Sequence, residues 1–112
     1  MSYQYSNGLC HEALRLLSSD DDFEMRLVRA FGEMGVSREG DTSDEIWQEW
    51  KDLKRKYQTL SGEIYQRRKN GVVDREMTTE LKEIGQSLVA LICDWMEFNT
   101  AQISKGILKR AS

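Results

Sequence analysis

Apolar side chains recur along two long stretches of the chain at alternating steps of four and three residues. This spacing places them on one face of an α-helix, in the heptad pattern of helices that pack along a common seam. Asn70 and Gly71 break the pattern between the stretches, so we expect an antiparallel helical hairpin whose seams face each other or a shared core. The first seam comprises Ile46, Trp50, Leu53, Tyr57, Leu60 and Ile64, and the second comprises Met77, Leu81, Ile84, Leu88, Leu91, Trp95 and Phe98.

Two shorter amphipathic stretches precede this hairpin. They predict helices over about residues 8–18 and 22–34, and the long helices are expected over about residues 43–69 and 74–109. Tyr3 and Tyr5 fall in a segment without a helical pattern. We therefore predict an all-α protein with a single domain over residues 1–112, a four-helix bundle built on a long antiparallel helical hairpin with two shorter N-terminal helices.

Local signals suggest where the helices begin and end. Asp21 precedes Glu24 by three residues, and Thr42 precedes Glu45 by the same spacing. Both pairs have the spacing of a capping box, which satisfies free backbone N–H groups at a helix N-terminus. Gly35 is expected to end the second helix in a left-handed conformation.

The fourth helix is expected to be about ten residues longer than the third, so the third cannot cover all of it. Either the two short helices fold back across its far end, or a second copy of the chain covers it as a homodimer. We favour the first for the monomer core. Gly62 and Gly85 lie at similar distances from the turn and could permit close approach of the long helices, and two tolerated surface glycines are the equally weighted alternative. The apolar residues that need cover are Phe98, Ile103, Ile107 and Leu108.

Composition agrees with a soluble helical protein. The chain is 39% hydrophobic and 31% charged and contains no proline, which would interrupt helices. The longest apolar run, residues 87–93, is far shorter than the roughly 20 residues of a membrane span. The N-terminus lacks the features of a secretory signal, so a cytoplasmic location is expected. Cys10 and Cys93 are expected to be buried thiols.

Charge is distributed unevenly along the chain. The net charge of −3 hides a balance of −6 through Glu45 and +4 from Ile46 to Arg75. A basic face on the third helix could contact nucleic-acid phosphates, which is one alternative hypothesis. Solvated charges opposite a helical core are the simpler interpretation. The basic residues concerned are Lys51, Lys54, Arg55, Lys56, Arg67, Arg68, Lys69 and Arg75.

Two pairs of acidic residues offer a second alternative. Glu49 with Asp52, and Glu80 with Glu83, each have a spacing of three residues, which places both carboxylates on one helix face. The pairs resemble the acidic motifs of MazG-type all-α nucleotide pyrophosphohydrolases, in which two helices present carboxylates to magnesium. The resemblance covers these four residues alone and implies a magnesium-dependent enzyme. Ordinary charges flanking a seam are the competing interpretation.

Other catalytic arrangements find little support in the sequence. His11 is the only histidine and falls on the polar side of its predicted helix. Cys10 is its neighbour in sequence, and adjacent side chains on a helix do not face each other, so the two do not form a nucleophile and its base. We expect no catalytic residue, no bound metal and no cofactor.

Aromatic residues beside the first seam point to protein binding. Trp47 and Tyr65 flank the seam, and exposed aromatic side chains commonly anchor protein partners. Extension of the core is the competing interpretation for Trp47. We therefore expect a small interaction protein, such as an adaptor, inhibitor, immunity factor or secretion chaperone, that binds another protein through a helix face. The expected contact residues are Trp47, Lys51, Lys54, Arg55, Tyr65 and Arg68.

Overall fold

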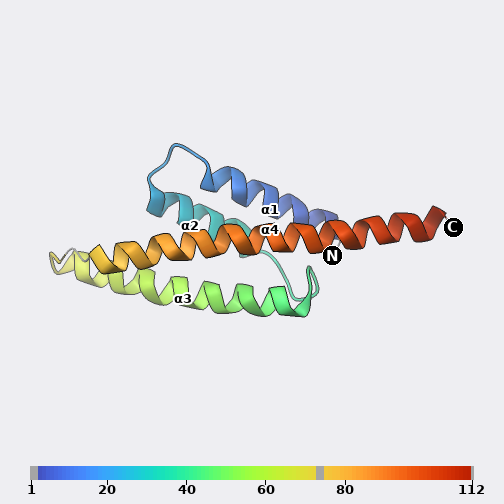
Figure 1. Ribbon diagram of the computed structural model, residues 1–112. Coiled ribbons are helices and arrows are strands. Elements are labelled where there is room, and N and C mark those ends of the chain that lie inside the picture. The colour runs from blue at the N-terminus through green and yellow to red at the C-terminus, as the bar shows by residue number, and fades with distance from the viewer. Residues whose placement is uncertain (1–2, 73–74, 112) are drawn as a thin grey trace.

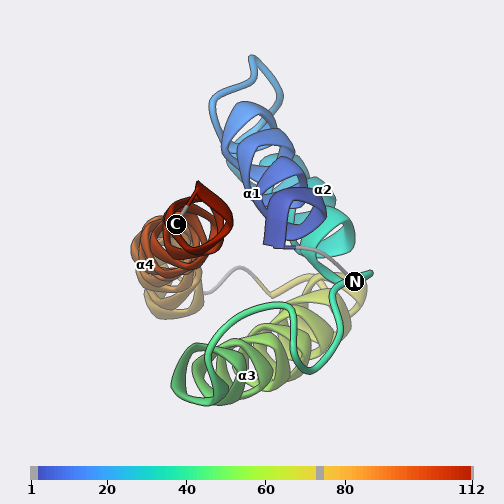
Figure 2. The ribbon, with the colours of Figure 1, turned by 90° about the vertical axis from the view of Figure 1, so that its right-hand side faces the viewer.

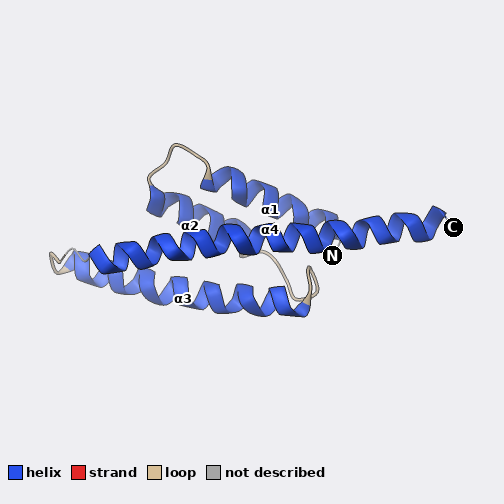
Figure 3. Cartoon of the chain, in the orientation of Figure 1, coloured by secondary structure: helices blue, strands red, loops and turns tan. Residues whose placement is uncertain are grey.

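The computed structural model of the protein describes residues 3–72 and 75–111, with side chains described as far as Gly106. Its helices are α1 (Tyr3–Leu17), α2 (Phe23–Met34), α3 (Asp44–Lys69) and α4 (Arg75–Ala111). The predicted all-α bundle with two short and two long helices is confirmed (Figure 3). The fourth helix is continuous from Arg75 to Ala111, whereas the sequence pattern did not decide whether it continues to its end.

Helices α3 and α4 run antiparallel and form the predicted long hairpin (Figure 1). Helices α1 and α2 form a second, shorter hairpin that packs along the first, as the end-on view of Figure 2 shows. The molecule is elongated, with principal dimensions of 64 × 28 × 19 Å. Helix α4 contacts both α1 and α3, so it is the central element of the bundle.

Both predicted seams lie in the core. On α3, Trp50 and Leu60 are buried, and the other seam residues are half-buried against the same cluster. On α4, every seam residue from Met77 to Trp95 is buried. Ile92 lies beside that seam and is buried too, because α4 packs against neighbours on more than one side. Among the described residues, no helix is both long enough and apolar enough to cross a membrane.

The far end of α4 is covered in part by the N-terminal half of the chain. Tyr3 on α1 packs edge-to-face against Phe98, with ring centroids 6.2 Å apart. The Asn99 side chain donates a hydrogen bond of 2.9 Å to the backbone oxygen of Asp41, in the loop between α2 and α3. Beyond these contacts α4 projects past the other helices (Figure 1). The predicted cover over Ile107 and Leu108 lies outside the described side chains.

Helix α1 begins at Tyr3 rather than near residue 8, so the prediction that Tyr3 and Tyr5 lack helical structure was wrong. The apolar pattern is hidden there because Ser6 occupies a buried position facing α4. The Trp95 indole N–H donates a hydrogen bond of 2.6 Å to the Ser6 hydroxyl oxygen. Gly8 lies on the exposed side of α1, and the helix continues through this residue.

The predicted helix caps were wrong by one residue. Asp22 caps α2 by accepting a hydrogen bond of 2.9 Å from the Met25 backbone N–H. Ser43 caps α3 by accepting a 3.2 Å bond from the backbone N–H of Ile46. Gly35 has φ −65° rather than a left-handed conformation, whereas Gly71 at the predicted turn has φ +78°. A short polar run supplies several candidate caps, and only tertiary packing selects one of them.

The expectations about small residues are met only in part. Gly62 is exposed, with open space where its side chain would be, as the surface alternative predicted, whereas Gly85 is buried against Phe23 of α2 rather than against α3. Cys10 is buried as expected, but Cys93 is exposed, and both are free thiols. Helical spacing alone does not decide which neighbour a residue at the edge of a seam will meet.

Candidate binding surfaces

A strip of exposed residues runs along the outer side of α3. Lys51, Arg55, Gln58, Gly62 and Tyr65 follow one another at steps of four, three, four and three residues, and all are exposed. Such steps keep side chains on one face of a helix. The strip is basic at its N-terminal end and aromatic at its C-terminal end. We refer to these five residues as the α3 strip.

Tyr65 is the most exposed large hydrophobic residue of the described chain, with 65% of its surface accessible. Gly62, one turn away, has no atom within 4 Å of the place where a Cβ would lie. A shallow, open hollow of about 630 Å³ lies over this part of α3, with Gly62 in its lining and Tyr65 outside it. The hollow is lined by Gln58, Thr59, Gly62, Glu63, Gln66 and Arg67.

The structure separates the predicted contact residues into different environments. Trp47 is half-buried and packs edge-to-face on Trp95, with ring centroids 6.3 Å apart, so it extends the core. Arg68 donates two hydrogen bonds to the carboxylate of Glu24 on α2. Lys54 is half-buried. The structure therefore brings Lys51, Arg55 and Tyr65 together on the α3 strip and places Trp47, Lys54 and Arg68 beside it.

The basic residues of α3 do not share one face. Lys56 lies in a groove between α3 and α4, where it lines a cavity of about 290 Å³ with Ser87 and Leu91. Arg68 is paired with Glu24, and Arg55 lies 3.6 Å from a carboxylate oxygen of Asp52. Phosphates along a nucleic acid would need free cations in a continuous row. The arrangement offers only short segments of such a row.

The two acidic pairs lie at different levels of the hairpin. Glu49 and Asp52 line the groove beside Ser87, whereas Glu80 and Glu83 are exposed one to two turns closer to the turn of the hairpin. With a rise of about 1.5 Å per residue, Glu80 lies roughly 10 Å along α4 from the level of Ser87. Among the described residues, no three histidine, cysteine or acidic side chains are grouped so that they could hold a metal ion.

Cys10, which the sequence offered as a candidate nucleophile, has a thiol of low reactivity. Burial raises the pKa of the Cys10 thiol to about 12, and the nearby Cys93 contributes to the rise. A thiol with so high a pKa stays protonated at neutral pH, and the thiolate is the nucleophilic form. His11 is exposed, as predicted from its position on the helix.

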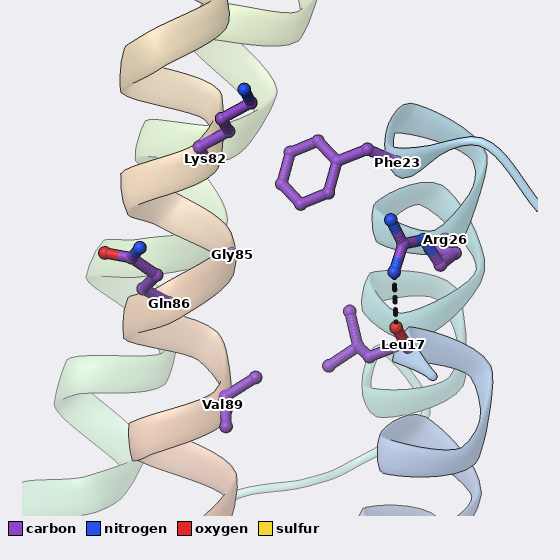
Figure 4. Close-up of a pocket in the computed structure, with 7 residues that line it drawn as sticks. All are labelled: Leu17, Phe23, Arg26, Lys82, Gly85, Gln86 and Val89. Atoms are coloured by element: carbon purple, nitrogen blue, oxygen red, sulfur yellow. Dashed lines mark hydrogen bonds between the residues drawn. The ribbon is translucent and has the colours of Figure 1, made fainter. Parts of the chain in front are cut away.

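A second candidate site lies where α1 and α2 meet α4, and the sequence pattern did not indicate it. A pocket of about 400 Å³ opens between the helices (Figure 4). Leu17 and Val89 face each other across it, and the Phe23 ring points from α2 towards α4. A Cβ on Gly85 would lie 3.0 Å from Cζ of Phe23, so the absence of a side chain there allows this ring to lie against α4. We call this site the interhelical pocket.

The interhelical pocket carries two cationic side chains, Arg26 and Lys82. Nη1 of Arg26 donates a hydrogen bond of 3.1 Å to the backbone oxygen of Leu17, and its guanidinium carbon lies 5.6 Å from the centre of the Phe23 ring. The Nε–H group of Arg26 is buried and lacks a hydrogen-bond acceptor among the described residues. None of the described residues that line the pocket is acidic.

The pocket combines residues of the α1–α2 hairpin with residues of α4, more than 50 positions further along the chain, which is why the pattern along the chain did not reveal it. The sequence contained one indication of the pocket, because Val89 is an apolar residue outside the seam of α4. In the structure Val89 is 40% exposed. Comparison with known proteins adds no assignment, because no family model, curated protein or solved structure matches the chain.

Proposed function

We propose that the protein acts by binding another protein through the α3 strip. The observation that carries the proposal is Tyr65, which is 65% exposed beside the hollow at Gly62. A large aromatic side chain held in water gains free energy when a partner buries it, and such residues dominate many interfaces. The helix beneath it is fixed to the core by Trp50 and Leu60, so little ordering is needed on binding.

The charge of the strip suggests the chemistry of the partner. Lys51 and Arg55 stand one turn apart on the same face, and Arg55 lies 3.6 Å from a carboxylate oxygen of Asp52 in an exposed contact. Acidic side chains on a partner would increase the association rate and fix its register along α3. The fitting partner is therefore a protein with an acidic segment next to a small apolar projection that enters the hollow and packs against Tyr65.

Affinity capture with matched variants tests this proposal. The tagged protein, Tyr65→Ala and Arg55→Glu are each incubated with a native lysate of the source organism, and bound proteins are quantified by mass spectrometry. We expect one stoichiometric protein to be captured by the wild type and reduced at least about tenfold by each substitution.

Val28→Ala is the control, because Val28 is 51% exposed on α2 and lies outside the strip. It should capture the same protein at the wild-type level. Circular dichroism of each variant should give the wild-type helix signal, since the substituted side chains are exposed. Equal capture by the wild type, Tyr65→Ala and Arg55→Glu would rule out the α3 strip as the binding surface.

A further inference from the structure

From the interhelical pocket we infer a second activity, the binding of a small amphipathic carboxylate such as a medium-chain fatty acid. The pocket lies between α4 and the α1–α2 hairpin, on elements that contribute nothing to the α3 strip. The inference is therefore independent of the proposed protein-binding function.

The walls of the pocket suit an apolar chain. Leu17, Phe23 and Val89 present carbon surfaces to it, and Figure 4 shows them on opposite sides of the opening. The volume of about 400 Å³ lies within the range of small-molecule sites and suits a ligand of one short chain. Filling it would remove the exposed part of Val89 from water, which favours binding in proportion to the apolar area covered.

The polar groups of the pocket suit an anionic head. Lys82 extends towards the Phe23 ring from α4, and Arg26 flanks the same ring from α2 (Figure 4). In the described part of the chain neither cation forms an ion pair with a carboxylate. Two such cations in an acid-free pocket are unexpected on a protein whose net charge is −3. Figure 4 places the Phe23 ring between the two cationic groups, so an anion in the pocket would form a charge-assisted hydrogen bond with one of them and be attracted by the other.

Arg26 gives the strongest reason to expect a polar head rather than an apolar ligand alone. Its guanidinium lines the pocket and forms no ion pair with a carboxylate of the described residues. The bond from Nη1 to Leu17 holds the guanidinium at the end of α1, beside the pocket. The remaining N–H groups of this guanidinium, which lines the pocket, can donate hydrogen bonds to a carboxylate placed there.

Isothermal titration calorimetry with decanoate tests the inference. We expect saturable binding of one decanoate per chain, and binding of decanol, which has the same chain length and no charge, at least about tenfold weaker. Lys82→Met keeps most of the apolar stem and removes the charge, so it should weaken decanoate about tenfold. Val89→Asp places a negative charge in the pocket and should remove detectable binding.

Two substitutions outside the pocket serve as matched controls. Lys105→Met removes an exposed lysine of the same helix, and Val28→Asp adds an acid at an exposed valine of α2. Both should bind decanoate as the wild type does. Equal affinity for decanol and decanoate, equal loss in Lys82→Met and Lys105→Met, or no saturable binding at all would each overturn the inference.

Discussion

At the scale of single residues, Ser6 is a polar side chain that lies in the core of the bundle. It is fully buried, and its hydroxyl oxygen accepts the hydrogen bond from the Trp95 indole. Trp95 is itself fully buried and packs edge-to-face against both Trp47 and Trp50. The hydroxyl therefore satisfies the one polar group of the largest side chain on α4.

Ser6→Ala should destabilise the protein by about 1–3 kcal/mol, because it leaves the Trp95 N–H buried without an acceptor. Urea unfolding followed by circular dichroism measures the change in free energy of unfolding. Ser104→Ala, at an exposed position of α4, is the control and should change stability by less than about 0.5 kcal/mol. Equal stability of Ser6→Ala and the wild type would show that this hydrogen bond contributes nothing to the fold.

Cys10 should make the protein less stable in alkaline solution. Burial raises its pKa to about 12 from an ordinary value of 9.0. Between these values the thiol ionises in the unfolded chain but stays protonated in the folded protein. The unfolded chain then binds fewer protons, so the free energy of unfolding falls as pH rises, by up to about 1.4 kcal/mol per pH unit.

The comparison of wild type with Cys10→Ala isolates this contribution. Urea unfolding at about pH 8 and about pH 10.5 should show a steeper loss of stability for the wild type than for Cys10→Ala. Cys93→Ala, which alters the exposed thiol, should retain the steeper loss. A stability difference between wild type and Cys10→Ala that does not change with pH would contradict the assignment.

At the scale of elements, the long helices were predictable because their apolar positions follow one period over many turns. Every seam residue of α4 through Trp95 is buried, as its spacing predicted. The start of α1 and the two caps were not predictable in the same way, because Ser6, Asp22 and Ser43 are small polar residues whose roles depend on neighbours. Their environments come from tertiary packing, which a pattern along one helix does not contain.

Gly62 gives a prediction in which stability and binding change in opposite directions. No atom lies within 4 Å of a Cβ built there, and alanine favours a helix over glycine, so Gly62→Ala should stabilise α3 by about 0.5–1 kcal/mol. The added methyl group lies on the α3 strip one turn from Tyr65, where it would obstruct a partner packed against that ring, so capture of the proposed partner should decrease. Thermal unfolding and affinity capture measure the two effects on one variant.

Gly85→Ala provides the comparison for that result. Its Cβ would lie 3.0 Å from Cζ of Phe23, so the ring must shift and the gain in helix propensity is offset. It should be less stable than Gly62→Ala and should retain partner capture. A loss of stability in Gly62→Ala would mean that the open space beside α3 is filled in solution.

At the scale of the whole molecule, the candidate surfaces differ in how far the sequence could indicate them. The α3 strip lies on one helix, so the exposure of Lys51, Arg55 and Tyr65 could be inferred from their positions outside the seam. Trp47 could not be assigned that way, because its contact with Trp95 depends on how α3 and α4 meet. The interhelical pocket combines Arg26 with Lys82 and Val89 only after two hairpins have packed together.

Phe31 connects the two hairpins through a contact separate from that of α1 with α4. Its ring stacks on Tyr57 with centroids 4.0 Å apart and on Trp50 with centroids 5.7 Å apart, which connects α2 to α3 across the core. Phe31→Ala should therefore reduce the free energy of unfolding by about 3–5 kcal/mol. Phe31→Leu retains much of the volume and should lose less.

The shape of the unfolding transition tests this joining role directly. Urea unfolding followed by tryptophan fluorescence reports on α3 and α4, and far-ultraviolet circular dichroism reports on all four helices. In the wild type the two signals should change together, because α4 packs against α1 of the other hairpin as well as against α3. If they separate in the wild type, the hairpins unfold independently, and the contact of Phe31 with Trp50 and Tyr57 does not couple them.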